Sequence, residues 1–296
     1  MRHIHIFIIL LIMNTLHAQD SLLLWPDGAP GAKGTTANDM PRMYVYLAPD
    51  ITTEAPAMLI CPGGAYAGLA MNHEGHQAAA WCNKLGMHAF VLAYRVNNND
   101  FTGYGYPAQL QDAERAMRII RSNAAQWKIH KDKIGVMGFS AGGHLASTLA
   151  THYSIGNPEA TDQIERLSAR PDFVVLVYPV ISMKDGITHK HSRKMLAAND
   201  KPTEEFILHL SNELCVNSLT PPTILIHASD DKGVLPENSI LFYKALLEHN
   251  IAAELHIYKN GGHGFGFRIT DPVLSTWPDR VRDWMVASEI LQTVDN

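Results

Sequence analysis

A serine flanked by glycines offers the clearest chemistry in this sequence. The run Ile134-Gly-Val-Met-Gly-Phe-Ser140-Ala-Gly-Gly-His-Leu-Ala146 joins an apolar stretch to a helix-like one through a Gly-x-Ser-x-Gly turn. A serine on a sharp strand-to-helix turn has a strained backbone, so its neighbours two residues away must lack bulk, as Gly138 and Gly142 do. The pattern predicts a nucleophile elbow built around Ser140. On this stretch alone, a glycine-rich turn that merely contains serine is the alternative.

Two segments could supply N–H groups for a developing oxyanion. The apolar run 55–61 ends in Pro62-Gly-Gly-Ala-Tyr66, where backbone N–H groups can point at a ligand without side-chain obstruction. Gly64 and Ala65 are the candidate donors in this loop, and Ala141, which follows the serine at the start of a helix, is the third. Without the serine motif, an ordinary tight loop would be the favoured interpretation of residues 62–66.

A base and an acid follow later in the chain. His263 is flanked by Gly262 and Gly264 in a loop after a strand-like run. Asp231 lies in a turn directly after the apolar run 223–228. The order Ser140, Asp231, His263 is the order of an α/β-hydrolase triad, in which the histidine is the general base. Because Asp230 and Asp231 are adjacent, the sequence leaves open which carboxylate reaches His263.

The elements that would position these groups alternate along the chain. Apolar or alternating runs predict strands at 43–47, 55–61, before Ser140, and at 87–94, 173–180, 223–228 and 253–258. Helix-like stretches are predicted at 78–85, 110–127 and 238–249 and after Ser140. Residues 22–31 predict an irregular arm. The pattern is typical of a mostly parallel sheet flanked by helices, in one domain spanning 19–296.

Two segments modify this plan. In the helix predicted at 110–127, Arg115, Arg118 and Arg121 fall opposite the apolar stripe, so we expect a solvated, partly ion-paired face. The segment 182–222 breaks the alternation and holds a histidine and lysine cluster with one amphipathic stretch. We interpret it as a small cap inserted into the domain, where substrate selectivity would lie.

Composition limits the partners and cofactors. The chain has 24 basic and 29 acidic residues and no basic block, so nothing in it recruits nucleic acid or an anionic membrane. His73-Glu-Gly-His76 places its histidines three apart rather than four, and no third ligand is evident, so no metal and no organic cofactor are expected. We expect Cys61 and Cys82 to be buried thiols, with a disulfide among Cys61, Cys82 and Cys215 as the alternative.

The first 18 residues resemble a secretory signal peptide. Arg2 precedes an apolar core at 4–13, and a small residue, Ala18, stands before Gln19. The core is shorter than the roughly 20 residues that span a bilayer. The sequence therefore predicts export to the periplasm or beyond, with no stable membrane insertion after cleavage at 18; an uncleaved anchor is the alternative.

These motifs together resemble the acetyl xylan esterase-like α/β hydrolases, which are related to hormone-sensitive-lipase-like and feruloyl-esterase-like carboxylesterases. The resemblance extends from about Leu24 to about Trp284. It is carried by Pro62-Gly-Gly-Ala-Tyr66, His73-Glu-Gly75, Tyr94-Arg95, Tyr106-Pro107, Asp112-Ala113, the serine run, Tyr178-Pro-Val-Ile-Ser182, Pro221-Pro222, Asp230-Asp231, Pro236-Glu-Asn-Ser239 and Gly262-His-Gly-Phe265. It implies Ser140 as nucleophile, His263 as base, Asp231 as acid, and Gly64, Ala65 and Ala141 as oxyanion donors. In this chain Ala65 replaces the third glycine that is usual in the family's loop.

The resemblance also implies a substrate. A serine esterase of this kind would remove small acyl groups, above all acetyl, from a plant-type polysaccharide or oligosaccharide such as acetylated xylan. Two alternatives are another esterase, either a feruloyl esterase or a general short-chain carboxylesterase, and a serine peptidase, which would usually carry an additional domain. A third is a catalytically silent sugar-binding protein, which the presence of all three triad residue types disfavours.

Overall fold

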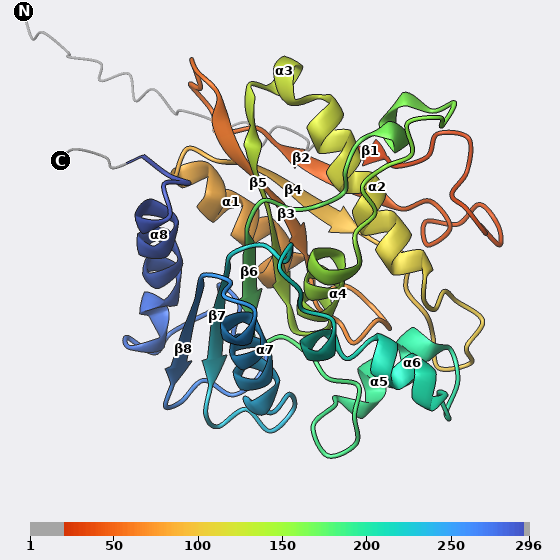
Figure 1. Cartoon of the computed structure of the whole chain (residues 1–296), viewed down its shortest axis with the longest axis vertical. Helices are drawn as coiled ribbons and strands as arrows, with labels where there is room; N and C mark the ends of the chain where they lie inside the picture. The colour runs from red at the N-terminus through yellow and green to blue at the C-terminus, as the bar shows by residue number, and fades with distance from the viewer. Residues whose placement is uncertain (1–20, 293–296) are drawn as a thin grey trace, which may run out of the picture.

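An eight-stranded sheet runs through the computed structural model, which describes residues 21–292 (Figure 1). Its strands in chain order are β1 (Ser21–Leu23), β2 (Arg42–Tyr46), β3 (Ala55–Cys61), β4 (His88–Ala93), β5 (Ile129–Phe139), β6 (Val174–Val177), β7 (Thr223–Ala228) and β8 (Ala253–Tyr258). In space their order is β1-β2-β4-β3-β5-β6-β7-β8. Only the pairs β1–β2 and β2–β4 are antiparallel. The predicted, mostly parallel sheet is confirmed.

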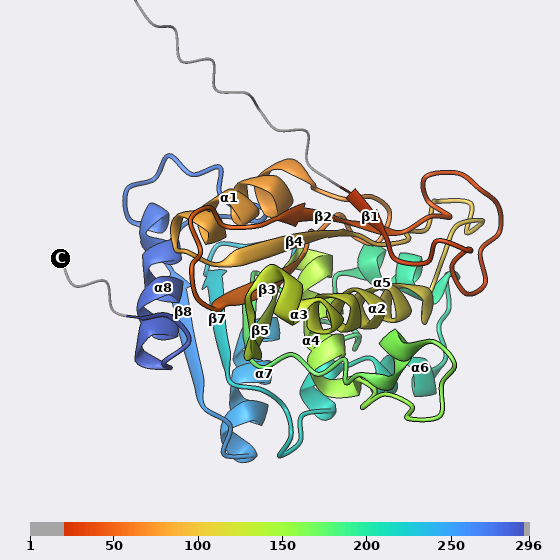
Figure 2. The same cartoon turned by 90° about the horizontal axis from the view of Figure 1, so that it is seen from above.

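Helices cover both faces of this sheet, as Figure 2 shows from above. The α-helices are α1 (Gln77–Lys84), α2 (Ala108–Ser122), α3 (Ala124–Trp127), α4 (Ser140–His152), α5 (Lys190–Ala197), α6 (Glu204–His209), α7 (Glu237–Glu248) and α8 (Trp277–Ala287). A π-helical turn, η1 (Asn72–His76), precedes α1, and short 3-10 helices lie at η2 (Gln163–Arg166), η3 (Asn212–Leu214) and η4 (Leu274–Thr276).

Alternation along the central strands divides the core into two layers. In β3, Leu59 packs with the apolar residues of α2, α4 and α7, whereas Met58 and Ile60 pack with those of α1 and α8. Successive side chains of a strand point to opposite faces, so a strand that is apolar at every position is buried on both sides. This explains why the uninterrupted apolar runs could be assigned to inner strands.

The prediction of one long helix at 110–127 with a solvated arginine face is wrong in two respects. The helix is divided at Asn123 into α2 and α3. Its arginine face is also not solvated, since Arg115 and Arg118 are each only 5% exposed. The segment around η2 crosses this face, where Glu165 accepts hydrogen bonds from both guanidinium groups at 2.7 and 2.8 Å. Spacing within a helix reveals which residues share a side, but not which distant segment covers that side.

The N-terminal arm and the segment 182–222 frame the domain. The irregular arm predicted at 22–31 is corrected at its start, because Leu22 and Leu23 belong to β1 and pair with β2. The segment 182–222 contains α5, α6 and η3 and contributes no strand. Figure 1 shows α5 and α6 near the lower end of the sheet, toward which β7 and β8 point. The predicted signal peptide, residues 1–18, lies outside the described residues.

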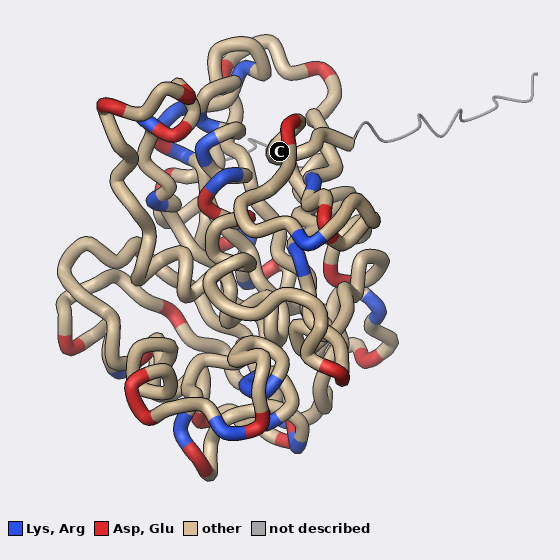
Figure 3. The backbone as a smooth tube through the Cα atoms, turned by 90° about the vertical axis from the view of Figure 1, so that its right-hand side faces the viewer, with Lys and Arg blue, Asp and Glu red and all other residues tan. Residues whose placement is uncertain are grey.

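Charges of both signs lie close together on the surface of the described part of the chain. None of the helices within 21–292 combines the length and apolarity needed to cross a bilayer. Figure 3 shows Lys and Arg interspersed with Asp and Glu over the face that it presents. Several surface pairs have opposite charges in contact, as Arg282 does with Asp279 at 3.0 Å.

Candidate active site

Ser140 lies where β5 ends and α4 begins. Its φ of +52° places a non-glycine residue in the left-handed region, which is the strained backbone expected of an elbow. The flanking glycines are required by contact: a Cβ on Gly142 would stand 2.1 Å from the carbonyl oxygen of Cys61, and one on Gly138 would stand 2.2 Å from that of Gly142. The helix can therefore start directly against the end of β3, with the serine at its first residue.

The structure brings Ser140, His263 and Asp231 into one hydrogen-bonded chain. Ser140 Oγ lies 2.8 Å from His263 Nε2, and His263 Nδ1 lies 2.7 Å from Asp231 Oδ2. Ser140 directly follows β5, Asp231 and His263 lie in the loops after β7 and β8, and the carboxyl ends of these parallel strands meet at one edge of the sheet. Ser140 is 7% exposed, and the His263 side chain is 29% exposed. In this arrangement Nδ1–H donates to the carboxylate and leaves Nε2 free to accept the serine proton.

The two adjacent aspartates make different contacts, and the carboxylate of Asp231 is the one that reaches His263. Asp231, which is 2% exposed, accepts hydrogen bonds at Oδ1 from the N–H groups of Gly233 and Val234, each at 2.9 Å. Burial alone would raise its pKa, but the nearby imidazoles of His227 and His263 and the hydrogen bond from the Val234 N–H outweigh burial and hold the pKa well below its usual range. Asp230 instead accepts from the N–H of Gly262 at 2.8 Å.

The predicted oxyanion loop, residues 62–66, lies against the elbow. A Cβ on Gly63 would stand 2.9 Å from Cβ of Ser140, which shows how closely the loop approaches the serine. Gly64 and Ala65 follow with φ values of +133° and +57°. Ala65 therefore adopts a left-handed backbone without being glycine, at a cost of roughly 1 to 3 kcal/mol. Two of the three predicted donors thus lie in the loop beside Ser140, and the third, Ala141, follows the serine in α4.

Four buried residues beside these groups have no role predicted from the sequence. Glu74 and Tyr178 hydrogen-bond to each other at 2.9 Å between the loop 62–66 and the loop that carries His263. On the other side, Tyr66 donates to His144 Nδ1 at 2.8 Å, and His144 Nε2 donates to the Leu210 carbonyl at 2.8 Å. All four residues lie in motifs that carry the family resemblance. Their place in those motifs is the sequence feature that could have marked them as part of the site.

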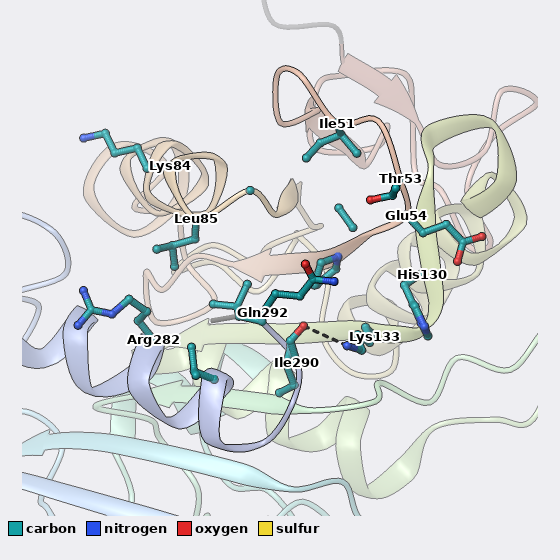
Figure 4. Close-up of a pocket in the computed structure, with 15 residues that line it drawn as sticks. Ile51, Thr53, Glu54, Lys84, Leu85, His130, Lys133, Arg282, Ile290 and Gln292 are labelled. Atoms are coloured by element: carbon teal, nitrogen blue, oxygen red, sulfur yellow. Dashed lines mark hydrogen bonds between the residues drawn. The ribbon is translucent and has the colours of Figure 1, made fainter. Parts of the chain in front are cut away.

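A separate pocket of about 700 Å³ opens at the opposite end of the strands (Figure 4). Ala55 at the start of β3 and His130 near the start of β5 line it, together with Lys84, Arg282 and Ile290. Lys133 donates to the backbone carbonyl of Ile290 at its floor. The pocket therefore lies away from Ser140, which follows the other end of β5.

The described part of the chain offers few ligands for a metal. Within residues 21–292, no three or more His, Cys, Asp and Glu side chains are gathered so as to hold an ion. His76 Nδ1 hydrogen-bonds to the Tyr46 hydroxyl at 2.5 Å. Cys61, Cys82 and Cys215 are free thiols, and Cys61 and Cys82 are fully buried.

Comparison with known proteins gives a consistent set of relatives. Residues 43–246 match the protein family described as BD-FAE. The chain is 38% identical over 214 residues to an acetylxylan esterase of Xylanibacter ruminicola, covering 71% of this chain and 41% of that protein. It is 37% identical over 242 residues to endo-1,4-beta-xylanase B of Butyrivibrio fibrisolvens, covering 80% of this chain and 36% of that protein. The chain thus spans about two fifths of the length of these relatives.

A solved structure matches over nearly its full length. The acetyl ester-xyloside bifunctional hydrolase from Caldicellulosiruptor lactoaceticus superposes with a TM-score of 0.85 at 37% identity, covering 92% of this chain and 97% of that one. A carboxylesterase from Lactobacillus plantarum superposes with a TM-score of 0.72 at 22% identity, covering 90% and 98%, and this second likeness shows the fold alone.

Proposed function

The chain belongs to the BD-FAE family and has the α/β-hydrolase fold, and from this premise we propose that it is a serine-dependent carboxylic ester hydrolase acting on acetyl esters. One observation carries the proposal. Ser140 Oγ, His263 and Asp231 form a continuous hydrogen-bonded chain, with 2.8 Å between serine and histidine and 2.7 Å between histidine and aspartate. A nucleophile, a base and an orienting carboxylate in that order are what acyl transfer from an ester requires.

In the first half of the reaction, His263 Nε2 takes the hydroxyl proton as Ser140 Oγ attacks the ester carbonyl carbon. Asp231 holds the imidazole in the tautomer that presents Nε2 and stabilises the imidazolium that forms. The carbonyl oxygen becomes an oxyanion, which the N–H groups of Gly64, Ala65 and Ala141 would stabilise. When the intermediate collapses, the imidazolium returns the proton to the departing alcohol, and the acyl group stays on the serine.

Water completes the cycle. His263 takes a proton from a water molecule, whose oxygen attacks the acyl carbon, and the second tetrahedral intermediate expels Ser140 as the proton returns to Oγ. The products are a carboxylic acid and a regenerated serine. No step of this cycle involves a group beyond the chain, the ester and water.

An acetylated plant polysaccharide or oligosaccharide, such as acetylated xylan, is the substrate class that we propose. The support is the 38% identity to an acetylxylan esterase and the 37% identity to an acetyl ester-xyloside bifunctional hydrolase, 97% of whose chain is covered. The segment 182–222 would then act as the cap that selects the substrate. The apolar N-terminal segment 4–13 supports the further proposal that the protein is exported, to the periplasm or beyond.

The test is acetate release from acetylated xylo-oligosaccharides, measured beside p-nitrophenyl acetate and methyl ferulate. We expect Ser140→Ala to lower kcat on the acetylated sugar by at least about 1,000-fold, because a triad without its nucleophile retains only binding and oxyanion stabilisation. Ser122→Ala is the matched control. Ser122 is in α2, where its Oγ donates to the Ile119 carbonyl at 2.8 Å, and its variant should keep full activity.

The substrate panel separates the outcomes. Serine-dependent turnover of the aryl acetate without release from the sugar would retain the hydrolase and reject the polysaccharide assignment. A preference for methyl ferulate would reject the acetyl specificity in favour of a feruloyl esterase. Ser140-independent hydrolysis, or none at all, would overturn the proposed mechanism.

A further inference from the structure

A buried carboxylate, that of Glu74, lies beside the triad and the oxyanion loop but has no part in the proposed reaction. Glu74, in the π-helical turn η1, is only 3% exposed. Its Oε2 accepts a hydrogen bond from the N–H of Gly63 at 2.8 Å, at the base of the oxyanion loop. A Cβ on Gly63 would stand 2.6 Å from that oxygen, so the loop and the carboxylate are in direct contact.

The second oxygen of Glu74 contacts the histidine side of the site through Tyr178. The fully buried Tyr178 hydroxyl donates to Glu74 Oε1 at 2.9 Å and accepts from the N–H of Gly266 at 2.8 Å. Its ring packs edge to face on His263, with centroids 5.0 Å apart, and on Phe265 at 4.4 Å. Burial, with Glu74 adding to it, raises the pKa of Tyr178 well above its usual value, so the hydroxyl keeps its proton as a donor.

Further hydrogen bonds to the backbone connect η1 and α8 with the loop that carries His263. The N–H of Phe267 donates to the carbonyl of His73 at 3.0 Å, so the residue next to Glu74 also contacts the histidine loop. The indole N–H of Trp277 donates to the Gly266 carbonyl at 3.0 Å and fixes the loop from α8. Tyr178 itself has a φ of +39°, a strained conformation of the kind that persists where surrounding contacts over-determine it.

We propose that Glu74 and Tyr178 form one positioning unit that sets the oxyanion loop and the His263 loop relative to each other. The inference rests on the proposed function for its catalytic consequence, while the mechanical coupling of the two loops stands independently. Neither residue contacts Ser140 Oγ in the hydrogen bonds described, so both act through the groups that they hold. Since an offset of about 1 Å in a catalytic group can cost about 100-fold in rate, loosening either loop should affect the chemical step.

Two near-isosteric variants test the unit by kinetics. Glu74→Gln keeps the side-chain shape but offers one acceptor oxygen where two are used, and Tyr178→Phe removes only the hydroxyl. Each should lower kcat on p-nitrophenyl acetate by about 10- to 100-fold while KM changes by less than about 3-fold. The kcat of the double variant should lie within about 3-fold of the kcat of the poorer single variant, because substitutions of residues that act as a unit do not have additive effects. Unchanged kcat in both folded single variants, or losses that multiply, would overturn the proposal.

A matched control separates positioning from loss of a buried hydrogen bond. Tyr104 is also buried, and its hydroxyl also donates to a buried carboxylate, that of Asp39, but neither residue has a hydrogen bond to the loop 62–66 or to the loop that carries His263. Tyr104→Phe should lower the melting temperature without lowering kcat by more than about 2-fold. If Tyr104→Phe reduced kcat as much as Tyr178→Phe does, the effect would be one of general stability and the proposal would fail.

Amide hydrogen exchange provides a readout that does not require turnover. In Glu74→Gln, exchange should rise about 10-fold in 263–266, which Glu74 does not touch directly, as well as in 63–66. In Tyr178→Phe, it should rise in 63–66 as well as in 263–266. A rise confined to the directly contacted loop would reject the coupling. If one variant does not fold, exchange in the other variant, measured in the loop that its substituted residue does not contact directly, decides whether the loops are coupled. A wild-type protein that hydrolyses no ester would reject the proposed function, while the exchange result would still decide whether the two loops are coupled.

Discussion

Asp231 differs from Asp230 in what its carboxylate oxygens contact. One oxygen of Asp231 accepts two backbone N–H groups and the other faces His263 Nδ1, so the carboxylate is fixed before any substrate binds. His227 Nε2 lies 3.4 Å from the oxygen that faces His263 and donates to the Val234 carbonyl at 2.9 Å, which fixes that ring as well. Such surroundings define one tautomer of His263, which is the main contribution of the acid in a triad.

At the residue scale, we predict that Asp231→Asn lowers kcat by about 1,000- to 10,000-fold, because an amide that donates to His263 Nδ1 favours the wrong tautomer. Asp230→Asn is the matched control, since its remaining side-chain oxygen can still accept from the N–H of Gly262, and its kcat should stay within about 3-fold of wild type. Steady-state hydrolysis of p-nitrophenyl acetate measures both. Equal losses in the two variants would contradict the assignment of Asp231 as the acid.

At the scale of elements, α4 connects the elbow to the segment that we interpret as the cap. His144 lies one turn after Ser140 and hydrogen-bonds to Tyr66 of the oxyanion loop and to the Leu210 carbonyl. Asn212 donates to Ser147 Oγ at 2.7 Å one turn further along the helix. A single helix thus carries the nucleophile and hydrogen-bonds to both the oxyanion loop and the cap segment.

His144 predicts a pH dependence of stability. Burial lowers its pKa from 6.5 to about 4. The unfolded chain therefore binds a proton as the pH falls below 6.5, whereas the folded chain does not until about pH 4. The stabilisation is complete above pH 6.5 and is lost between 6.5 and 4, by about 3 kcal/mol in the free energy of unfolding.

The measurement is urea denaturation of wild type and His144→Gln at pH 7, 5.5 and 4. Burial also lowers the pKa of His76, His88 and His152, so wild-type stability has other acid-sensitive contributions. The difference between the two proteins isolates His144, and we expect it to shrink by about 3 kcal/mol from pH 7 to pH 4. Two parallel stability curves would show that His144 does not titrate in this way.

At the scale of the whole molecule, a buried ion pair attaches the N-terminal arm to the sheet. Arg95 follows β4 and contacts Asp112 of α2, with Nη2 2.7 Å from Oδ1 and both side chains fully buried. The same guanidinium donates from Nη1 to the Pro30 carbonyl at 2.6 Å and stacks on Trp25, with its centre 5.6 Å from the ring centroid. One residue thus joins the arm, the sheet and the helix layer.

We predict that Asp112→Asn lowers the free energy of unfolding by about 3 to 5 kcal/mol, because it leaves a buried guanidinium without its counter-charge. Asp283→Asn breaks an exposed pair with Arg282 and should cost no more than about 1 kcal/mol. Chemical denaturation compares the two variants. A cost below about 1 kcal/mol for Asp112→Asn would mean that the pair does not hold these layers together.

The sequence by itself determined the features that depend on near neighbours in the chain. The inner strands could be predicted because burial on both faces favours apolar residues at successive positions, as in β6, which is Val-Val-Leu-Val and buried throughout. The elbow could be predicted because the steric demand of Ser140 falls on glycines two residues away. These requirements are local, so they are visible as composition and spacing.

The tertiary structure decided what depends on residues that are distant in the chain. Asp231 rather than Asp230 faces His263, 32 residues further on, and Glu74 meets Tyr178 across 104 residues. The same applies to Arg115, whose expected solvation is prevented by Glu165, 50 residues away. Each outcome depends on how loops from separate strands approach one another at a common surface. Spacing along the chain does not encode that approach, because it results from the packing of the whole sheet and its helices.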